Sequence, residues 1–261
     1  MRFFASISYN GAGLCGWQIQ QNAPSVQEEL QKALSAVLRE EISVVGAGRT
    51  DTGVNARGFT AHFDSQDDTI VKEHDRLVYK INAILPKNIV LHSLTRVRDD
   101  AHARFDADSR TYRYYVHSRK DPFIRDLSWY CKFPLDMPAM NRAAAYLLGR
   151  HDFSCFEKAG GASSSPFCDV SAAGWSPYTP SCAPLPGTGY MVFTITANRF
   201  LRNMVRAIVG TLVEVGRGRR DPESIPDLIA SGDRCVAGQS VPGHALFLTE
   251  VHYPENIYIY Q

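Results

Sequence analysis

The sequence predicts an α+β protein made of two related halves. Three observations predict this class. The first hundred residues read as strand, helix, strand, strand, helix, strand, the remaining residues repeat this order more loosely, and no short internal repeat is present. The order is typical of a ferredoxin-like sandwich, in which helices cover one face of an antiparallel sheet. We therefore expect one domain over residues 1–105 and a second over residues 106–261.

The elements of the first half follow from capping and from apolar spacing. Ser25 and Glu28 form a capping box at the start of a helix that reaches residue 38, with apolar side chains on one face. A second helix is expected over residues 70–83, and Ile84 continues its apolar stripe. Strands are expected over residues 3–9, 42–45, 60–63 and 89–97.

The second half is expected to hold further helices beside a second set of strands. Asp136 opens one helix, which Gly149 ends, and residues 200–215 form the most apolar helix of the chain. Asp221 starts another short helix. Residues 160–166 are small and polar, which predicts a mobile loop. Strands are expected over residues 111–116, 190–197 and 245–251.

The composition is that of a globular chain and excludes several classes of protein. The chain has 261 residues, of which 44% are hydrophobic, and a formal net charge of +1, so no global field indicates a partner. No apolar run approaches the ~20 residues that span a bilayer. The N-terminal stretch, residues 1–7, is too short and too interrupted by polar residues for a signal peptide. The six cysteines do not form close pairs, so we expect reduced thiols in a cytosolic protein.

A dense polar cluster lies between two expected strands, in the segment 48–56. Gly48 and Gly53 permit a tight turn, from which Asp51 can point outward with Arg49 close by. A carboxylate in this position can act as a nucleophile or a base, and the guanidinium can bind an anion or keep the carboxylate ionised. The alternative interpretation is a tight turn with a solvated aspartate.

Arginine is concentrated in two windows, residues 96–125 and residues 199–220. Glu214 is the only acidic residue in the second window, and the first contains Phe105 and three tyrosines among its arginines. Guanidinium groups suit phosphate contacts and stacking on bases, and basic side chains interleaved with aromatic ones suit a groove for unpaired nucleic acid. The alternative is an ordinary solvated face beside core tyrosines.

Two positions in these windows hold candidate residues for an active site. Arg206 lies at the margin of the apolar arc of the 200–215 helix, where a guanidinium needs a partner, and we expect a carboxylate from elsewhere in the chain. Tyr112 and Tyr114 share one face of their strand. Either tyrosine can stack on a base, and either can be a core residue with its hydroxyl at the surface.

Several signatures of other enzymes are missing from the sequence. It has no metal-ligand spacing, no phosphate-loop lysine after Gly53 and no nucleophile elbow. Any chemistry is therefore expected to use Asp51 and the groups that fold around it, without a metal or a cofactor. Two rival classes stay open: a non-catalytic RNA-binding protein, and a phosphate-loop enzyme for a small nucleotide, which the missing lysine weakens.

Five segments, spread over almost the whole chain, share their order and spacing with one known family. They are Tyr9-Asn10-Gly11 with Gly16-Trp17-Gln18; Ser25-Val26-Gln27; Gly48 to Val54; His102-Ala103-Arg104-Phe105 with Tyr112-Arg113-Tyr114; and Asn203-Met204-Val205-Arg206 with Ile208-Val209-Gly210. In this combination the chain resembles the bacterial tRNA pseudouridine synthase A family.

The resemblance implies an isomerase that converts uridine to pseudouridine in the anticodon stem-loop of tRNA, at about positions 38 to 40, after flipping the target base. It implies that Asp51 is the catalytic aspartate, that Tyr112 packs on the target base and that Arg206 pairs with Asp51. The residues expected to contact substrate or RNA are Arg49, His102, Arg104, Phe105, Tyr112 and Arg202.

The resemblance also has implications for assembly. Two ferredoxin-like, RNP-like halves with antiparallel sheets are expected to meet at a central RNA-binding cleft. The protein is expected to be a cytoplasmic homodimer with tRNA as its partner, without a cofactor and without membrane association.

The sequence departs from the family's pattern in three places. Asn55 stands where the family often has histidine, which puts a proton-transfer role there in doubt. Asn10 and Cys15 replace a common aspartate and a common aromatic residue, so the loop that contains them can contact RNA differently. The segment 159–166 has small residues where related chains often carry basic or polar ones.

Overall fold

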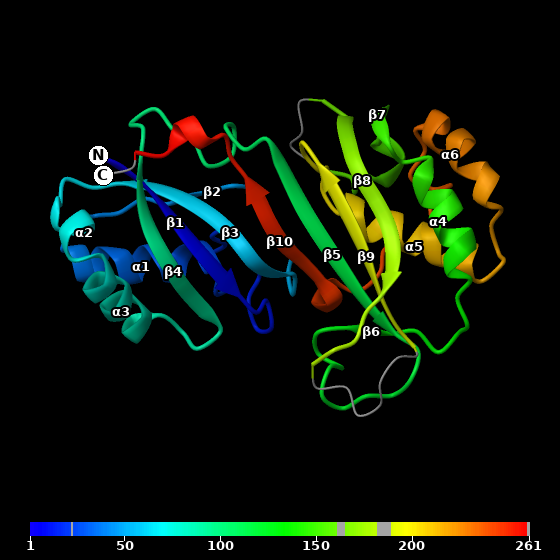
Figure 1. Cartoon of the computed structure of the whole chain (residues 1–261), viewed down its shortest axis with the longest axis horizontal. Helices are drawn as coiled ribbons and strands as arrows, with labels where there is room; N and C mark the ends of the chain where they lie inside the picture. The colour runs from blue at the N-terminus through cyan, green and yellow to red at the C-terminus, as the bar shows by residue number, and fades with distance from the viewer. Residues whose placement is uncertain (22, 161–164, 182–188, 260–261) are drawn as a thin grey trace. The chain divides into compact units, whose positions relative to one another are not determined.

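The structure is a computed structural model, and it describes residues 1–21, 23–160, 165–181 and 189–259. It contains two compact units (Figure 1). The first unit comprises Met1–Ser109 and Phe247–Gln261, and the second comprises Arg110–Leu246. The expected mobile loop falls partly on residues 161–164, which lie outside the described residues.

The first unit is a mostly antiparallel sheet with helices. Its strand order is β4-β1-β3-β10, and β2 pairs with β3. Helices α1 and α3 contact each other, and α3 contacts β4 (Figure 1). The bounds are β1 Arg2–Tyr9, α1 Val26–Leu38, β2 Val45–Gly46, β3 Asn55–Asp64, α2 Thr69–Lys72, α3 His74–Ile84, β4 Ile89–Val97 and β10 Leu246–His252.

Both faces of this sheet are covered. Phe3 and Phe63 are opposite each other in the β1–β3 register and stack on one face, with ring centroids 5.7 Å apart. The next pair, Phe4 and His62, lies on the other face because successive side chains alternate along a strand. A separate buried cluster covers that second face: Phe4, Val97, Ala101, Ala103, Ala107, Tyr253 and Ile257. The segment after β4 is therefore packed against the sheet.

The second unit has the strand order β5-β9-β8-β7, with antiparallel pairing, and β6 adds to β5 in parallel. Its longest helix, α5, is buried along almost its whole length, and α4 contacts both α5 and β8. The bounds are β5 Ser109–His117, β6 Trp129–Tyr130, α4 Met137–Ala145, β7 Gly149–Asp152, β8 Phe167–Pro177, β9 Tyr190–Ala197, α5 Met204–Gly216 and α6 Ile225–Ser231.

These elements confirm the predicted α+β class and much of the predicted order. The Ser25 hydroxyl caps α1 by accepting the Glu28 N–H at 3.3 Å. Strands β4 and β9 have the expected bounds. The short helix after Asp221 is also present, as a turn of 3₁₀ helix followed by α6.

Other expectations were wrong in detail. The expected 70–83 helix is interrupted at Glu73, whose backbone (φ −118°, ψ 31°) is not helical. Ile84 does not join the buried stripe, since this residue is 51% exposed. The apolar helix starts at Met204 rather than residue 200, because Asn203 adopts a left-handed conformation with φ 64°. Strands β6, β7 and β8 were not foreseen.

The units divide the chain differently from the expected boundary after residue 105. Strand β10 belongs to the first unit because it pairs in parallel with β3, with Phe247 opposite Asn55. The hydroxyl of Tyr253 then donates to the Ala103 carbonyl at 2.6 Å. Pairing between such distant segments is fixed by tertiary structure, and local sequence patterns carry no signal for it.

Candidate active site

The loop between β2 and β3 holds Asp51 in a defined turn. The Ala47 N–H donates to the Thr60 carbonyl at 2.8 Å, which closes the base of the loop. The Val54 N–H donates to the Asp51 carbonyl at 3.1 Å, and Gly53 has φ +74°, a conformation that favours glycine. Asp51 is half-buried and Arg49 is exposed. The turn therefore lies between two strands as predicted, with Asp51 partly exposed, although the first of these strands covers Val45–Gly46 rather than residues 42–45.

The loop after β1 fixes this turn from one side. The Tyr9 hydroxyl lies 2.9 Å from the Thr50 hydroxyl, in a buried contact, and the Trp17 N–H donates to the Thr50 carbonyl at 3.2 Å. The Asn55 side chain accepts the Gly11 N–H at 2.8 Å. Asn55 is 1% exposed, so at this position it joins two loops. The residues on both sides of Asp51 are thus tied to the body of the first unit.

Two glycines let the loops approach closely. A Cβ at Gly16 would lie 2.2 Å from the Thr50 carbonyl oxygen, and a Cβ at Gly11 would lie 2.4 Å from the Val54 carbonyl oxygen. Both distances are far inside van der Waals contact, and both neighbours are backbone atoms. This close approach of the two loops was not predicted from the sequence. Gly11 and Gly16 were the signal that could have indicated it.

We expect Gly16→Ala to disturb the Asp51 loop. Gly16 has φ +82°, so alanine adds backbone strain to the clash with Thr50, and we expect a loss of about 2–4 kcal/mol in the free energy of unfolding. Activity should fall with it, because Thr50 precedes Asp51. Gly13→Ala is the control: Gly13 has φ +77°, but no atom lies within 4 Å of the position that an added methyl group would take. Thermal denaturation and turnover of both variants test this, and equal effects would contradict it.

The second unit holds Tyr112 and Arg206. Tyr112 on β5 is half-buried, and its ring meets Phe200 edge-on, with centroids 5.1 Å apart. Arg206, in the first turn of α5, is half-buried, and its Nε donates to the Val241 carbonyl at 2.7 Å. The Val241 N–H donates in return to the Arg206 carbonyl at 3.2 Å. The arginine is thus held to the segment that precedes β10.

The structure separates the roles of the two tyrosines. Tyr114 is fully buried, and its hydroxyl donates to the Pro242 carbonyl at 2.9 Å. Burial raises the pKa of Tyr114 far above its ordinary value. Tyr114 is therefore a core residue. Of the two tyrosines, only Tyr112 is half-buried rather than fully buried, so it is the one that could meet a base.

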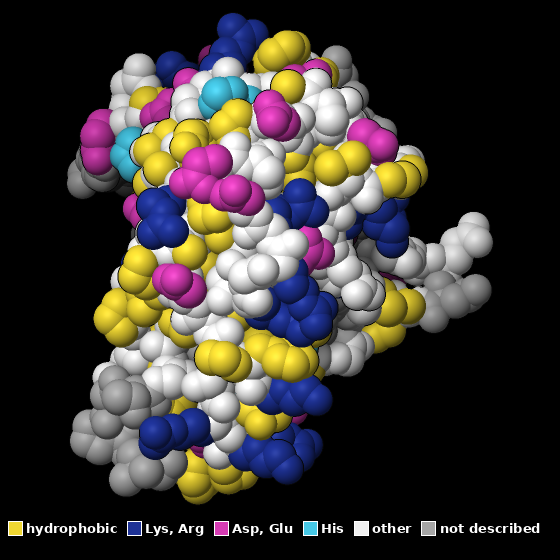
Figure 2. All heavy atoms as spheres, turned by 90° about the vertical axis from the view of Figure 1, so that its right-hand side faces the viewer, with side chains coloured by type: hydrophobic (Ala, Val, Ile, Leu, Met, Phe, Trp, Pro, Cys, Tyr) yellow, Lys and Arg dark blue, Asp and Glu magenta, His cyan; other side chains and the backbone are white. Residues whose placement is uncertain are grey.

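The arginine windows divide into structural and exposed members. Arg96 pairs with Asp99 at 2.7 Å, and Arg220 pairs with Glu214 at 3.0 Å. Arg217 stacks over the ring of Phe133 at 3.7 Å. Basic side chains recur on the face of the second unit shown in Figure 2. Exposed Arg202 donates to the carbonyls of Ala159 and Gly160, at 3.4 and 3.3 Å. The windows thus contribute fewer candidate RNA contacts than their composition indicates.

The segment 101–106 presents three of the expected RNA contacts together. The rings of His102 and Phe105 lie 4.3 Å apart, and the Arg104 guanidinium lies 5.6 Å from the centre of the Phe105 ring. Phe105 is 74% exposed. An exposed aromatic ring beside a guanidinium is a surface suited to stacking on bases.

Below this segment, His62 is held in its neutral form. The residue is 6% exposed. Burial, with the nearby positive charge of Arg2 as the next cause, lowers the pKa of His62 to about 4. Burial also lowers the pKa of His102. Asp64 and Asp106 oppose the shift at His62 more weakly. His62 was not singled out from the sequence.

The lowered pKa of His62 predicts a pH dependence of stability. The unfolded state binds this proton near pH 6.5 and the folded state only near pH 4. The contribution of His62 to the free energy of unfolding is therefore complete above about pH 6.5 and is lost as the pH falls toward 4. Its size is about 2–4 kcal/mol. Urea denaturation of the wild type and of His62→Asn between pH 7 and pH 4.5 measures it: the variant should lose less stability on acidification. Parallel curves would contradict this.

The predicted site residues are divided between the two units. The first unit contains Asp51, Arg49, His102, Arg104 and Phe105. The second unit contains Tyr112, Arg202 and Arg206.

Among the described residues, no group of three histidine, cysteine or acidic side chains could hold a metal ion. Nor does any helix of the described segments have the length and apolar character needed to cross a membrane.

Comparison with known proteins identifies the class to which this fold and this loop belong. Residues 143–254 match the family profile described as tRNA pseudouridine synthase. A tRNA pseudouridine synthase A from Porphyromonas gingivalis is 46% identical over 258 residues, covering 99% of both chains. The enzyme of the same name from Parabacteroides distasonis is 45% identical, covering 98% of both chains, and that from Colwellia psychrerythraea is 37% identical, covering 98% of this chain and 95% of its own. The chain belongs to the tRNA pseudouridine synthase A family.

Proposed function

We propose that this protein is an isomerase that converts uridine to pseudouridine in tRNA. The observation that carries the proposal is the Asp51 loop: a half-buried aspartate in a turn whose neighbours, Thr50 and Asn55, are bonded to Tyr9 and Gly11. Membership of the family supports the reaction and the substrate class.

The reaction rearranges one nucleotide and needs no redox step. The N1–C1′ bond breaks, a C5–C1′ bond forms, the hydrogen at C5 leaves as a proton, and N1 gains a proton. In our proposal the Asp51 carboxylate acts on the nucleotide, either by attack at C1′, by attack on the base, or as a base. A fixed turn serves each of these routes, because it removes the entropy cost of placing the carboxylate.

We assign the other site residues to the same centre. Arg206 pairs with Asp51, balances its charge and directs it, while Tyr112 packs on the flipped base. Unstacking the base costs a few kcal/mol, which stacking on Tyr112 and phosphate contacts offset. Arg49 and Arg202 contact the RNA backbone, and the segment 101–106 lies against the tRNA.

The finer features of the proposal concern architecture and substrate. We propose two ferredoxin-like, RNP-like halves around a central RNA-binding cleft, in a cytoplasmic homodimer. The target is the anticodon stem-loop, at about positions 38 to 40. The exposed aromatic and basic side chains of the segment 101–106 support an RNA partner.

Release of tritium tests the proposed function directly. Transfer RNA labelled at uridine C5 should release label into water on incubation with the protein, because the C5 hydrogen is lost in the rearrangement. Mapping of pseudouridine in the product should place it in the anticodon arm. Binding of tRNA without release of label would instead identify the protein as a non-catalytic RNA-binding protein.

A further inference from the structure

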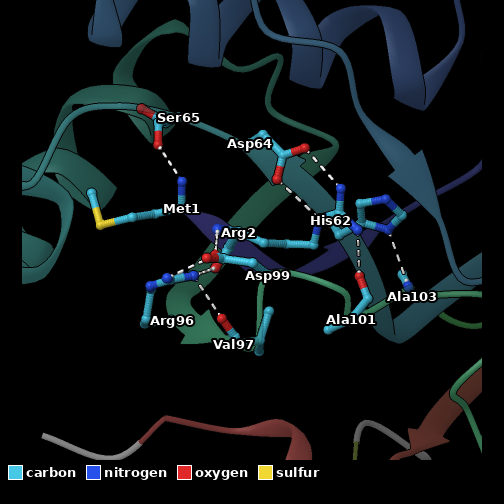
Figure 3. Close-up of polar contacts among 10 residues, drawn as sticks. All are labelled: Met1, Arg2, His62, Asp64, Ser65, Arg96, Val97, Asp99, Ala101 and Ala103. Carbon is cyan, nitrogen blue, oxygen red and sulfur yellow. Dashed lines mark hydrogen bonds and ion pairs between the residues drawn. The ribbon is translucent and has the colours of Figure 1, made fainter.

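We propose that His62 is a positioning residue that holds the segment 101–106 in the shape that contacts RNA; this rests on the proposed function. The contacts that carry the inference lie entirely within the first unit, and Figure 3 shows the side chains on the sheet side of the segment.

His62 is placed on a strand that leads directly out of the Asp51 loop. It lies near the end of β3, on the sheet face that carries Phe4, and its Nδ1 accepts the Ala103 N–H at 3.0 Å (Figure 3). Accepting this bond requires an unprotonated Nδ1, so Nε2 carries the proton of the neutral ring. The His62 ring also meets the His102 ring edge-on, with centroids 4.6 Å apart.

Two further contacts hold Ala101 and Ala103 of the segment. The Arg2 guanidinium pairs with Asp64 through Nε at 2.9 Å and Nη2 at 2.8 Å, and its Nη1 donates to the Ala101 carbonyl at 2.9 Å (Figure 3). The Tyr253 hydroxyl donates to the Ala103 carbonyl. Ala101 and Ala103 are both fully buried. The His62 bond therefore satisfies a buried N–H for which water cannot substitute without opening the segment.

The remaining bonds of the segment fix its outer side. The Asp106 carboxylate accepts the His102 N–H at 2.7 Å, and the His102 Nδ1 accepts the N–H groups of Arg104 and Phe105 at 3.1 and 3.3 Å. The orientation of the His102 ring thus sets the turn that projects Arg104 and Phe105 outward. The His62 side chain contacts the His102 ring and accepts the Ala103 N–H. A change at His62 is therefore transmitted to the exposed side chains of Arg104 and Phe105.

The physical consequence is a distinction between binding and chemistry. His62 is too buried to touch RNA. Its side chain contacts Ala103 and His102 of the segment, and only its backbone pairs with β1 and β2. Loss of the Ala103 bond should loosen the surface formed by Arg104 and Phe105 and weaken tRNA binding, while a nucleotide that does bind is converted at the normal rate. We expect His62→Ala to raise KM for tRNA about tenfold and to leave kcat within about twofold of wild type.

His62→Asn and Phe63→Leu are the matched variants. The Oδ1 of asparagine lies where the histidine Nδ1 lies, so His62→Asn can accept the Ala103 N–H and should recover most of the lost affinity. Phe63 is the next residue on β3, is 1% exposed and stacks with Phe3 on the opposite face. Phe63→Leu loosens the same strand without touching the segment, and it should leave KM near the wild-type value.

A double-mutant cycle separates positioning from general loss of stability. In an Arg104→Ala/Phe105→Ala background, which should itself raise KM, His62→Ala should add little, because the surface that it holds has been removed. An equal rise in KM in both backgrounds, or a wild-type KM in His62→Ala, would overturn the inference. So would a wild-type KM in the background variant. Wild-type protein without turnover would instead refute the proposed function.

Discussion

Replacement of Asp51 by asparagine should reduce turnover of tRNA to background, a loss of about 10³-fold or more. Asparagine keeps the size of the side chain but cannot carry a negative charge, so it can neither attack as a carboxylate nor accept a proton as one. Release of tritium from C5-labelled tRNA measures the loss. Rates near wild type in Asp51→Asn would remove Asp51 from the centre of the proposed mechanism.

The same variant should keep its fold and most of its affinity for tRNA. The contacts that fix the turn use the Thr50 hydroxyl and carbonyl, the Asn55 amide and the Asp51 backbone carbonyl. None of these depends on the charge of the Asp51 carboxylate. Filter binding and thermal denaturation check this. Asp227→Asn, at an exposed position in the first turn of α6, is the matched change of charge and should leave turnover and affinity for tRNA unaltered.

Local rules in the sequence predict the elements that frame the site. The Ser25 cap and the alternation of β4 and β9 depend on near neighbours, and the structure agrees with them. The break at Glu73 was missed because the apolar spacing continues across it. Strand β8 was missed because its exposed residues interrupt the apolar alternation that marks a strand.

The candidate site was less accessible to sequence reasoning than the fold. The pairing of Gly11 with Asn55 and that of His62 with Ala103 join residues more than forty positions apart. No local pattern specifies such bonds, because they follow from the sheet register. The choice between Tyr112 and Tyr114 also required the structure, since both lie on one face of β5 and only burial distinguishes them.

Arg206→Lys should lower kcat/KM about 10- to 100-fold, the second large effect that we expect. Arg206 donates from Nε to Val241, and this bond directs the rest of the guanidinium. A lysine carries the same charge as a single ammonium group. It cannot both bond to Val241 and present the parallel N–H groups with which arginine pairs a carboxylate. Loss of one charge-assisted bond costs about 1.5–3 kcal/mol, which gives this range.

Arg219→Lys provides the control for this prediction. Arg219 is exposed and lies just beyond the same helix, so its substitution should leave the kinetics unchanged. Because the charge is kept in Arg206→Lys, nonspecific attraction to tRNA should persist, and the loss should fall mainly on kcat. Wild-type kcat in Arg206→Lys, with Asp51→Asn inactive in the same assay, would show that the aspartate works without this arginine. Equal losses in both lysine variants would point to a general effect of arginine content on RNA binding.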